Sequence, residues 1–453
     1  MSRFRKLYPQ ALAAIAGGIL TTEVGIMCAW SSPYIAQLIG DNSPLPLTKE
    51  QASWVASLLY LGRFIGAVLG SILVSYMGSK KTTFLTAFPI SIGWILIMMA
   101  TSPTWLYFAR VSLGIGFGCV YSCFTLFLGE VAMPEIRGCL VSFACIGAPL
   151  GNYLASLTGA RMSLKTSSQT YLGICIVFMI IAFILPDSPH HLVKMGNLDS
   201  AKKSIEWYQG TDKVEKELED VTNFVRSTTV SSFSERLAEF KLYHVRRATI
   251  LVVMLYAFMQ LSGLNSLLVY METILQNSGS NIIEPSSAVS WVLLSGVFVS
   301  AGCVGLYDKC GRRLLFIVSS LGSGLALALL GTHFALKNSN IDWWGSQWLP
   351  LISLFLFNNA FVVGLGSIPS IVSSEVYATN VKPIAACVAN LTASGTGFLA
   401  TKAYQPLVDL VGESYVFYGH AVILMLAMPY ALLYMPETKG KSLQQIQDDL
   451  IRK

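Results

Sequence analysis

Apolar stretches long enough to cross a bilayer recur along the whole chain. A membrane-spanning helix needs about 20 predominantly apolar residues. The chain of 453 residues is 53% hydrophobic and only 12% charged, unlike an ordinary soluble domain. We expect spans near 11–36, 51–75, 82–101, 104–129, 138–160, 170–186, 247–276, 287–308, 313–336, 348–376, 383–410 and 414–435. The sequence therefore predicts an all-α membrane protein with twelve transmembrane helices, for which the lipid bilayer is the first partner.

Basic residues lie unevenly on the two sides of these spans. Short cytoplasmic loops collect Lys and Arg. With both termini inside, that side receives 24 of the 31 basic residues and the other side 4, and the split without the long 187–246 loop is still 14 to 4. We therefore predict a multi-pass protein with both termini cytoplasmic. The net charge of +6 follows from this topology, so nucleic acid is not an expected partner.

One long hydrophilic stretch, 187–246, separates six spans from six. It predicts an N-terminal bundle (1–186), a cytoplasmic linker (187–246), a C-terminal bundle (247–435) and a cytoplasmic tail (436–453). Apolar residues such as Leu192, Ile205 and Phe224 recur among the charges of the linker, which favours short amphipathic helices at the membrane face. A disordered linker is the alternative.

The two sets of six spans repeat the same motifs. "GSILVSYMGSKKT" at 70–82 and "GLYDKCGRR" at 305–313 each follow a second span, while "GEVAMPEIRG" at 129–138 and "SEVYATNVKP" at 374–383 each follow a fourth. The halves are therefore pseudo-repeats. Parallel six-span repeats place a solute site between the halves near the bilayer midplane.

Further motifs add a family resemblance over nearly the whole chain, namely "PETKGKSLQQI" at 436–446, "PDSPHHLV" at 186–193, "QLSGLN" at 260–265, "WSSP" at 30–33 and "TK" at 401–402. With "YDKCGRR" at 307–313 they resemble the sugar porters of the major facilitator superfamily, and among these the insect facilitated trehalose transporter-like proteins. The resemblance implies alternating-access transport of a small sugar, trehalose or a hexose, across the cell membrane. It implies no enzyme activity and no cofactor, and the sequence defines no oligomeric state.

Charged residues at the span ends are predicted to form a cytoplasmic gate, the part that matching residues play in the family. Ion pairs at a membrane surface can fasten and release two halves reversibly. A charge at membrane depth such as Arg110 costs at least ~2.5–3.5 kcal/mol unless it is paired. The predicted gate is Arg110, Glu130, Arg137, Asp308, Arg312, Arg313, Glu375 and Lys382. The first-half copy is degraded, since Ser75, Tyr76 and Ser79 stand where the family has charged residues.

Polar residues inside the spans are the candidate solute ligands. Gln260 and Asn265 match family residues that bind sugar hydroxyls, but on an ideal helix they would point about 140° apart. They converge only if the chain bends at Gly263. Tyr270 is a weaker candidate, because aromatic residues on spans more often pack. Asn358 and Asn359 either line the cavity or fasten neighbouring helices.

Glycines and a proline in "GLGSIPS" at 364–370 predict a hinge in the tenth span, formed by Gly364, Gly366 and Pro369. Glycines also permit close helix packing, as on the second span at 62, 66 and 70.

Several positions depart from the sugar-porter pattern. Cys145, Gly296, Ser370, Ala393 and Ser394 stand where the family has Gln, Asn, Trp, Asn and Trp. A buried hydroxyl without a partner costs about 1–3 kcal/mol. Trehalose is therefore only the leading substrate.

Glu23 is the only acidic residue of the first span and a possible proton site, because proton-coupled relatives carry an acid about one turn away. Pairing with Arg63 of the second span is the simpler alternative. We expect a uniporter, with a proton-coupled symporter and a non-transporting sensor of the same fold as alternatives. We find no metal-ligand spacing and no catalytic motif.

Overall fold

The computed structural model describes residues 2–39, 45–133, 136–210, 214–229, 235, 238–280, 282–303, 305–341, 345–377, 381–441 and 445–446, without the side chains of 2–7, 227–229 and 308. Twelve helical spans in these ranges are long and apolar enough to cross a membrane, as predicted. The sixth span starts earlier than expected, at Leu164, because Ser163 caps the helix by accepting a hydrogen bond from Thr166 N and the first turns are polar.

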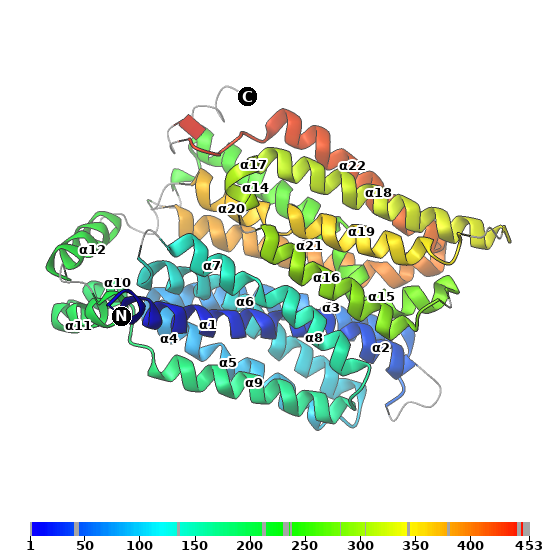
Figure 1. The fold of residues 1–453 in the computed structure, drawn as a ribbon, viewed down its shortest axis with the longest axis horizontal. Coiled ribbons are helices and arrows are strands. Elements are labelled where there is room, and N and C mark those ends of the chain that lie inside the picture. Colours follow the sequence, from blue (N-terminus) through cyan, green and yellow to red (C-terminus); the bar gives the residue numbers. More distant parts are fainter. Residues whose placement is uncertain are drawn as a thin grey trace.

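The chain forms two layers of helices that run along the long axis of the molecule (Figure 1). The first half consists of α1 (Ser2–Ala29), α2 (Ser31–Ile39), α3 (Lys49–Met77), α4 (Ser79–Leu85), α5 (Ala87–Met98), α6 (Pro103–Val131), α7 (Arg137–Cys145), α8 (Gly147–Gly159) and α9 (Leu164–Ile184). The second half consists of α14 (Tyr243–Leu261), α15 (Leu264–Ser278), α16 (Pro285–Cys303), α17 (Leu306–Cys310), α18 (Arg312–Asn338), α19 (Leu349–Val363), α20 (Ile368–Val376), α21 (Lys382–Val411) and α22 (Glu413–Tyr434).

Each half has its own hydrophobic core. Trp94 and Phe178 are fully buried in the first core, and Phe316 and Phe417 in the second. The second core also takes in Ala52 of α3, so the halves touch there.

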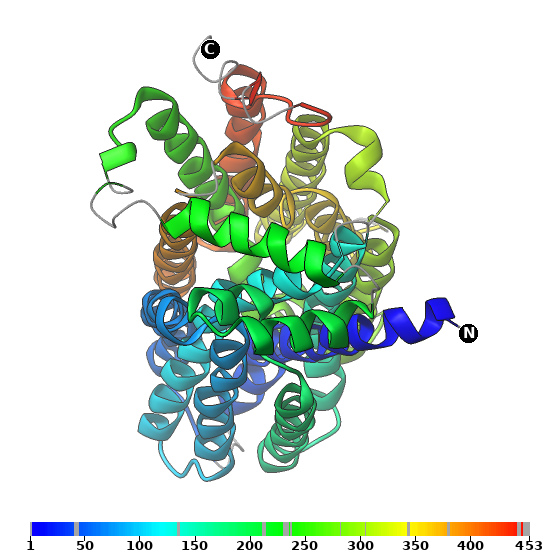
Figure 2. The same ribbon diagram turned by 90° about the vertical axis from the view of Figure 1, so that its left-hand side faces the viewer.

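Three short helices lie between the halves in sequence: α10 (Pro189–Lys194), α11 (Leu198–Gln209) and α12 (Val214–Thr229). They lie across one end of the bundle, beside the start of α1 (Figure 2). We call this the linker end and the opposite one the far end. The Gln10 side chain of α1 joins them to the first half, because its Nε2 donates to Tyr208 O and its Oε1 accepts from Met133 N. The linker therefore contains helices attached to the first half.

A glycine seam brings α3 and α6 of the first half into close contact. A Cβ on Gly62 would lie 2.3 Å from Val111 O, and a Cβ on Gly66 would lie 2.1 Å from Ile115 O. The two backbones can approach this closely only because both positions lack a side chain. These glycines serve packing, as the sequence suggested.

Two spans of the second half are broken at the glycine-containing segments where the sequence predicts a bend or a hinge. The seventh span bends between α14 and α15 at Gly263, whose φ is +85°. The tenth span breaks over 364–367, between α19 and α20. A third break, at Trp30 between α1 and α2, was not predicted. It precedes Pro33, which has no N–H to continue the helical bonding.

Candidate solute site and gate

The break at Gly263 brings Gln260 and Asn265 into contact. Asn265 Nδ2 donates to Gln260 Oε1 at 2.8 Å, and the Tyr60 hydroxyl of α3 donates to Asn265 Oδ1 at 2.6 Å. The His420 ring donates from Nδ1 to the Leu261 carbonyl at the same break, at 2.9 Å. The bend at Gly263 thus produces the predicted convergence of the two amides, and it joins them to a residue of the other half.

A second polar contact crosses between the halves one turn along α3. Arg63 Nη2 donates to Asn390 Oδ1 of α21 at 3.1 Å, and the guanidinium lies 4.5 Å from the centre of the Phe117 ring. Sequence reasoning missed Tyr60 and Asn390 and gave Arg63 the wrong partner. The only signal available was a charge in the middle of a span.

Three other predicted ligands contact neighbouring helices. Tyr270 stacks on Tyr404 with ring centres 4.9 Å apart. Asn358 Nδ2 donates to Val292 O, and Asn359 Oδ1 accepts from Ser295 Oγ, so both asparagines bind α19 to α16. These contacts agree with the role of fastening neighbouring helices, and the role of lining the cavity stays a prediction.

Polar contacts between the halves also occur toward the far end. Ser156 and Ser290 share a hydrogen bond of 2.9 Å, which links α8 to α16. Ser32 Oγ accepts from Glu272 N at 3.1 Å, and Ser53 Oγ donates to Lys402 O at 3.4 Å. In this state the halves are therefore held together at their far ends.

Arg110 does not belong to the predicted gate. It lies 20 residues before Glu130 on the single helix α6, which places it about 30 Å away toward the far end. It is fully buried, and its guanidinium donates to Val55 O, Met27 O and Ser31 Oγ. These three oxygens stabilise the buried charge of Arg110. Those of Met27 and Ser31 lie beside the break in the first span.

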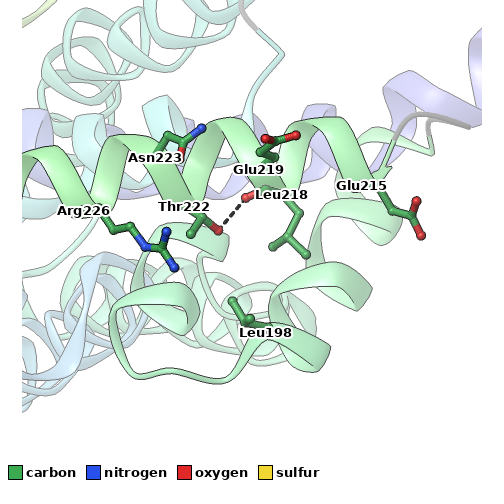
Figure 3. A pocket seen from close by; sticks show the side chains of 7 residues that line it. All are labelled: Leu198, Glu215, Leu218, Glu219, Thr222, Asn223 and Arg226. Carbon is green, nitrogen blue, oxygen red and sulfur yellow. Dashed lines mark hydrogen bonds between the residues drawn. The ribbon is translucent and has the colours of Figure 1, made fainter.

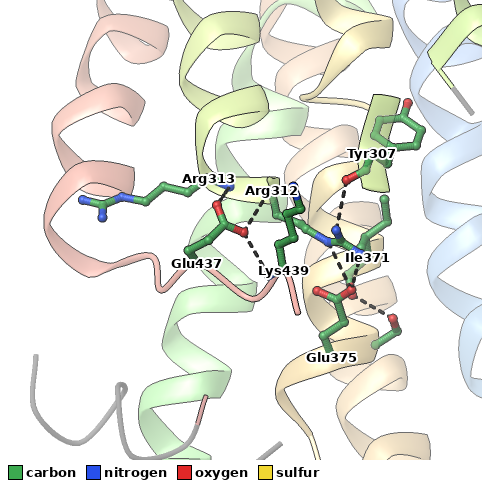
Figure 4. A network of polar contacts seen from close by, with 8 residues as sticks. Tyr307, Arg312, Arg313, Ile371, Glu375, Glu437 and Lys439 are labelled. Atoms are coloured by element: carbon green, nitrogen blue, oxygen red, sulfur yellow. Dashed lines mark hydrogen bonds and ion pairs between the residues drawn. The ribbon is translucent and has the colours of Figure 1, made fainter. Parts of the chain in front are cut away.

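The clearest ion pair at the linker end joins Arg312 to Glu375. Arg312 Nη2 lies 2.8 Å from Glu375 Oε1, and Nη1 donates to Tyr307 O (Figure 4). The Tyr307 hydroxyl lies 3.2 Å from Val362 O and 3.0 Å from Ser367 Oγ, at the break in the tenth span. Helix α20 is thus attached at both ends to the corner between α17 and α18.

Glu437 of the "PETKG" motif caps the first turn of α18. Its carboxylate accepts from the backbone N–H groups of Arg312, Arg313 and Lys439 (Figure 4). Burial acts to raise the pKa of Glu437, but these hydrogen bonds outweigh it and hold the pKa below the usual 4.5. The side chain of Arg313 turns away and donates to Ala431 O and Leu432 O.

The first half has a weaker version of the same corner. The Ser79 hydroxyl donates to Glu130 Oε2, where the second half uses an arginine. Lys80 and Lys81 lie 4.0 Å and 3.6 Å from Asp187 of the "PDSP" motif. The degraded motif therefore retains its acidic partners.

The remaining predicted gate residues make no ion pair that the structure describes. Arg137 and Lys382 are exposed, and within the described ranges neither lies within 4.0 Å of a carboxylate. The side chain of Asp308 lies outside the described residues. The contacts of Glu130, Arg312, Arg313 and Glu375 described above each lie within one half. In this state they join helices within a half and do not join one half to the other.

Glu23 pairs with Trp94 and not with Arg63. Trp94 Nε1 donates to Glu23 Oε2 at 2.9 Å, and Glu23 Oε1 has no partner among the described residues. The expected Glu23–Arg63 pair is wrong, because the two side chains point to different neighbours: Glu23 into the first half, Arg63 toward the second.

A shallow hollow between α11 and α12 is unrelated to the span residues (Figure 3). Its lining comprises Leu198, Glu215, Leu218, Glu219, Thr222, Asn223 and Arg226, all on the linker helices.

Comparison with known proteins agrees with this arrangement. The profile of the family described as sugar (and other) transporter matches residues 14–450. The facilitated trehalose transporter Tret1 of Bombyx mori is 30% identical over 97% of this chain and 86% of its own length. Tret1 of Apis mellifera ligustica is 28% identical over 97% and 87%.

Solved structures agree on the fold. The xylose transporter XylE from E. coli in its inward open conformation superposes with a TM-score of 0.78 at 18% identity, covering 97% of this chain and 98% of its own. The proton:xylose symporter XylE bound to 6-bromo-6-deoxy-D-glucose gives the same score and identity over 98% and 99%. Because the family profile spans residues 14–450, the chain belongs to the family of sugar (and other) transporters.

Proposed function

We propose that the protein is a facilitative alternating-access transporter of a small sugar in the cell membrane, with the linker end in the cytoplasm. The observation that carries this proposal is the chain of hydrogen bonds from Tyr60 through Asn265 to Gln260. It lies at a helix break and connects the two halves. Gln260 Nε2 donates no hydrogen bond to any described residue, so it is available to a solute hydroxyl.

The contacts between the halves are weak enough to exchange. They are mostly neutral hydrogen bonds, each contributing about 0.5–1.5 kcal/mol. Reversing a two-state population from 1:99 to 99:1 takes about 5.5 kcal/mol. Parting the far ends while the linker ends meet is therefore within reach of a few such bonds. The predicted units 1–186 and 247–435 are the bodies that would rock.

The substrate follows from likeness and chemistry together. The insect relatives are named trehalose transporters. Amide and phenol groups such as Gln260, Asn265 and Tyr60 can serve the hydroxyls of a sugar. Trehalose and hexoses are therefore the first solutes to test.

Uptake into proteoliposomes tests the proposal. Labelled trehalose and glucose should accumulate faster than labelled sucrose leaks in, and Gln260→Ala should lower kcat/KM about tenfold, the equivalent of about 1.4 kcal/mol. Gln405→Ala is the matched control, since the Gln405 amide donates to Asp409 one turn along the same helix α21 and its loss should leave kcat/KM near wild type. Absence of flux for every sugar, with the folded protein in the vesicles, would favour a non-transporting sensor.

One observation favours a proton-coupled symporter as the second candidate. Glu23 is fully buried and no cation lies within ion-pair distance of it in the described part of the chain. A carboxyl in that environment can carry a proton through the membrane. Coupling predicts that an inward proton gradient drives sugar above equilibrium and that Glu23→Gln abolishes this accumulation but retains exchange. Equal final levels with and without the gradient would reject coupling.

A further inference from the structure

Arg63 is a buried cation whose hydrogen-bonding capacity is largely unused. Its side chain is 5% exposed, yet no carboxylate lies within 4.0 Å of it among the described residues. One of its five N–H groups donates to Asn390, and its Nε has no partner. The rings of Phe117 and Tyr121, at 4.5 Å and 5.1 Å, stabilise the charge from one face.

Arg110 shows what a satisfied buried arginine looks like in the same bundle. Its Nε, Nη1 and Nη2 each donate to an oxygen, two of them backbone carbonyls. Such a residue is part of the framework. Arg63 keeps a neutral amide and two rings, so it lacks the anion that a guanidinium normally binds when it is removed from water.

An exposed aromatic ring lies beside the Arg63 guanidinium. Tyr121, which touches the guanidinium, is 41% exposed. The same guanidinium binds Asn390 of the second half, so the Tyr121 ring lies next to a contact between the halves. The Tyr256 hydroxyl bonds to Ser370, which is also exposed. The exposed side of Tyr121 therefore faces the interior between the halves.

We propose that Arg63 makes the central site selective for a sugar acid, a small hydroxylated monocarboxylate, over the neutral sugar. This inference rests on the transport function proposed above and specifies its substrate class. The carboxylate takes the Nη N–H groups that have no partner among the described residues, while Gln260 and Asn265, which meet Tyr60 about one turn along α3, serve hydroxyls. A monoanion matches the single positive charge, whereas a phosphate dianion would leave one negative charge uncompensated.

The chain departs from the sugar-porter pattern at positions that agree with this assignment. Ser370, which stands where relatives have Trp, bonds to the Tyr256 hydroxyl, and Cys145, which stands where relatives have Gln, is exposed at the end of α7. With fewer hydrogen-bonding and aromatic groups, the site should bind a neutral sugar less tightly. The Arg63 cation supplies a stronger, charge-specific contact in their place.

Binding to the purified full chain in detergent tests the inference without requiring transport. Sodium galacturonate and galactose are compared at equal ionic strength, through the thermal unfolding midpoint and the half-saturating concentration. Galacturonate should bind at least tenfold more tightly than galactose. Arg63→Gln should remove this preference, so that the two solutes bind with equal affinity, while Arg63→Lys should keep part of it. Arg161→Gln, which removes an exposed charge in a loop, is the control and should bind like wild type.

Asn390→Asp tests the same idea in a variant that keeps the arginine. A carboxylate at position 390 lies where the amide now accepts from Arg63, so it should form an internal ion pair and compete with the solute. We expect it to fold at least as stably as wild type and to lose the galacturonate preference. Equal affinity of wild type for both solutes, or a preference unchanged in both variants, would overturn the inference.

Flux separates this inference from the proposed function. Transport of galactose alone, unaffected by Arg63→Gln, would reject the anion site and uphold sugar transport. Galacturonate binding that depends on Arg63, with no flux of either solute into proteoliposomes, would uphold the anion site and reject the transport function.

Discussion

The Ser79 hydroxyl donates to Glu130 at the place in the first half where Arg312 pairs with Glu375 in the second. The preceding glycines, Gly78 and Gly311, have nearly the same backbone conformation, with φ of +83° and +80°. Both halves therefore keep the same glycine turn and the same acidic residue. Only the hydrogen-bond donor to the carboxylate differs. A neutral hydroxyl holds the carboxylate less strongly than a guanidinium does.

The two corners should differ in how much their donors contribute to stability. Ser79→Ala removes one neutral donor and should cost about 1 kcal/mol, whereas Arg312→Ala removes a charged partner and should cost about 2–3 kcal/mol. Thermal unfolding in detergent measures both. Arg312→Ala combined with Glu375→Ala should recover part of the loss, because no unpaired charge remains. Equal losses from the two single changes would refute the asymmetry.

Replacing Glu437 by Gln should destabilise α18 in a pH-dependent way. The pKa of Glu437 is lowered in the folded protein, so its stabilisation is fully present above its usual value of 4.5 and is lost as the pH falls through the lower folded value. We expect the variant to be less stable by about 1 kcal/mol at pH 7. The gap between the unfolding curves should close below about pH 4.5. A gap that stays constant down to pH 3 would show that the charge is irrelevant.

Gly263→Ala should disturb the bend that brings Gln260 and Asn265 together. At φ +85° an alanine is strained, and its Cβ would lie 3.2 Å from the His420 ring. The expected cost is about 1–2 kcal/mol, with a raised KM for the solute. Gly419→Ala on α22 is the matched control, since a Cβ there meets nothing within 4 Å and the change should be neutral or slightly stabilising. Unchanged stability and KM in Gly263→Ala would contradict this role.

Tyr60→Phe should loosen the contact between the halves at the Gly263 break. Asn265 Oδ1 loses its donor, which costs about 1 kcal/mol and shifts the open population roughly fivefold. An Ala52→Cys reporter, buried where α3 meets the second half, should then react severalfold faster with an impermeant maleimide, in a chain whose nine native cysteines are replaced. Tyr34→Phe is the control, because the Tyr34 hydroxyl bonds to Met162 O within the first half. Equal rates in both variants would show that Tyr60 does not hold the halves together.

The sequence predicted features that depend on one helix and missed those that depend on neighbours. Twelve spans and the bends at Gly263 and 364–367 follow from length, hydropathy and backbone conformation, and all are present. The Arg63–Asn390 contact joins residues 327 positions apart, so no local pattern could supply it. Glu23 and Arg63 were paired only because each needed a partner.

One misplaced residue and one open assignment have more specific causes. Arg110 was grouped with Glu130 although the direction of α6 puts them at opposite ends. Asn358 and Asn359 could not be assigned from sequence, because adjacent residues on a helix point 100° apart and either face could have met the cavity.

The glycine seam between α3 and α6 limits how the molecule can move. The two main chains touch here without side chains between them. One helix therefore cannot slide or tilt past the other without a clash of backbone atoms. Tyr60 and Arg63 lie on this closely packed pair, whereas Asn265 of the second half follows directly after the break at Gly263. The pair should therefore move as one rigid unit, and its separation from Asn265 should begin with flexing at Gly263.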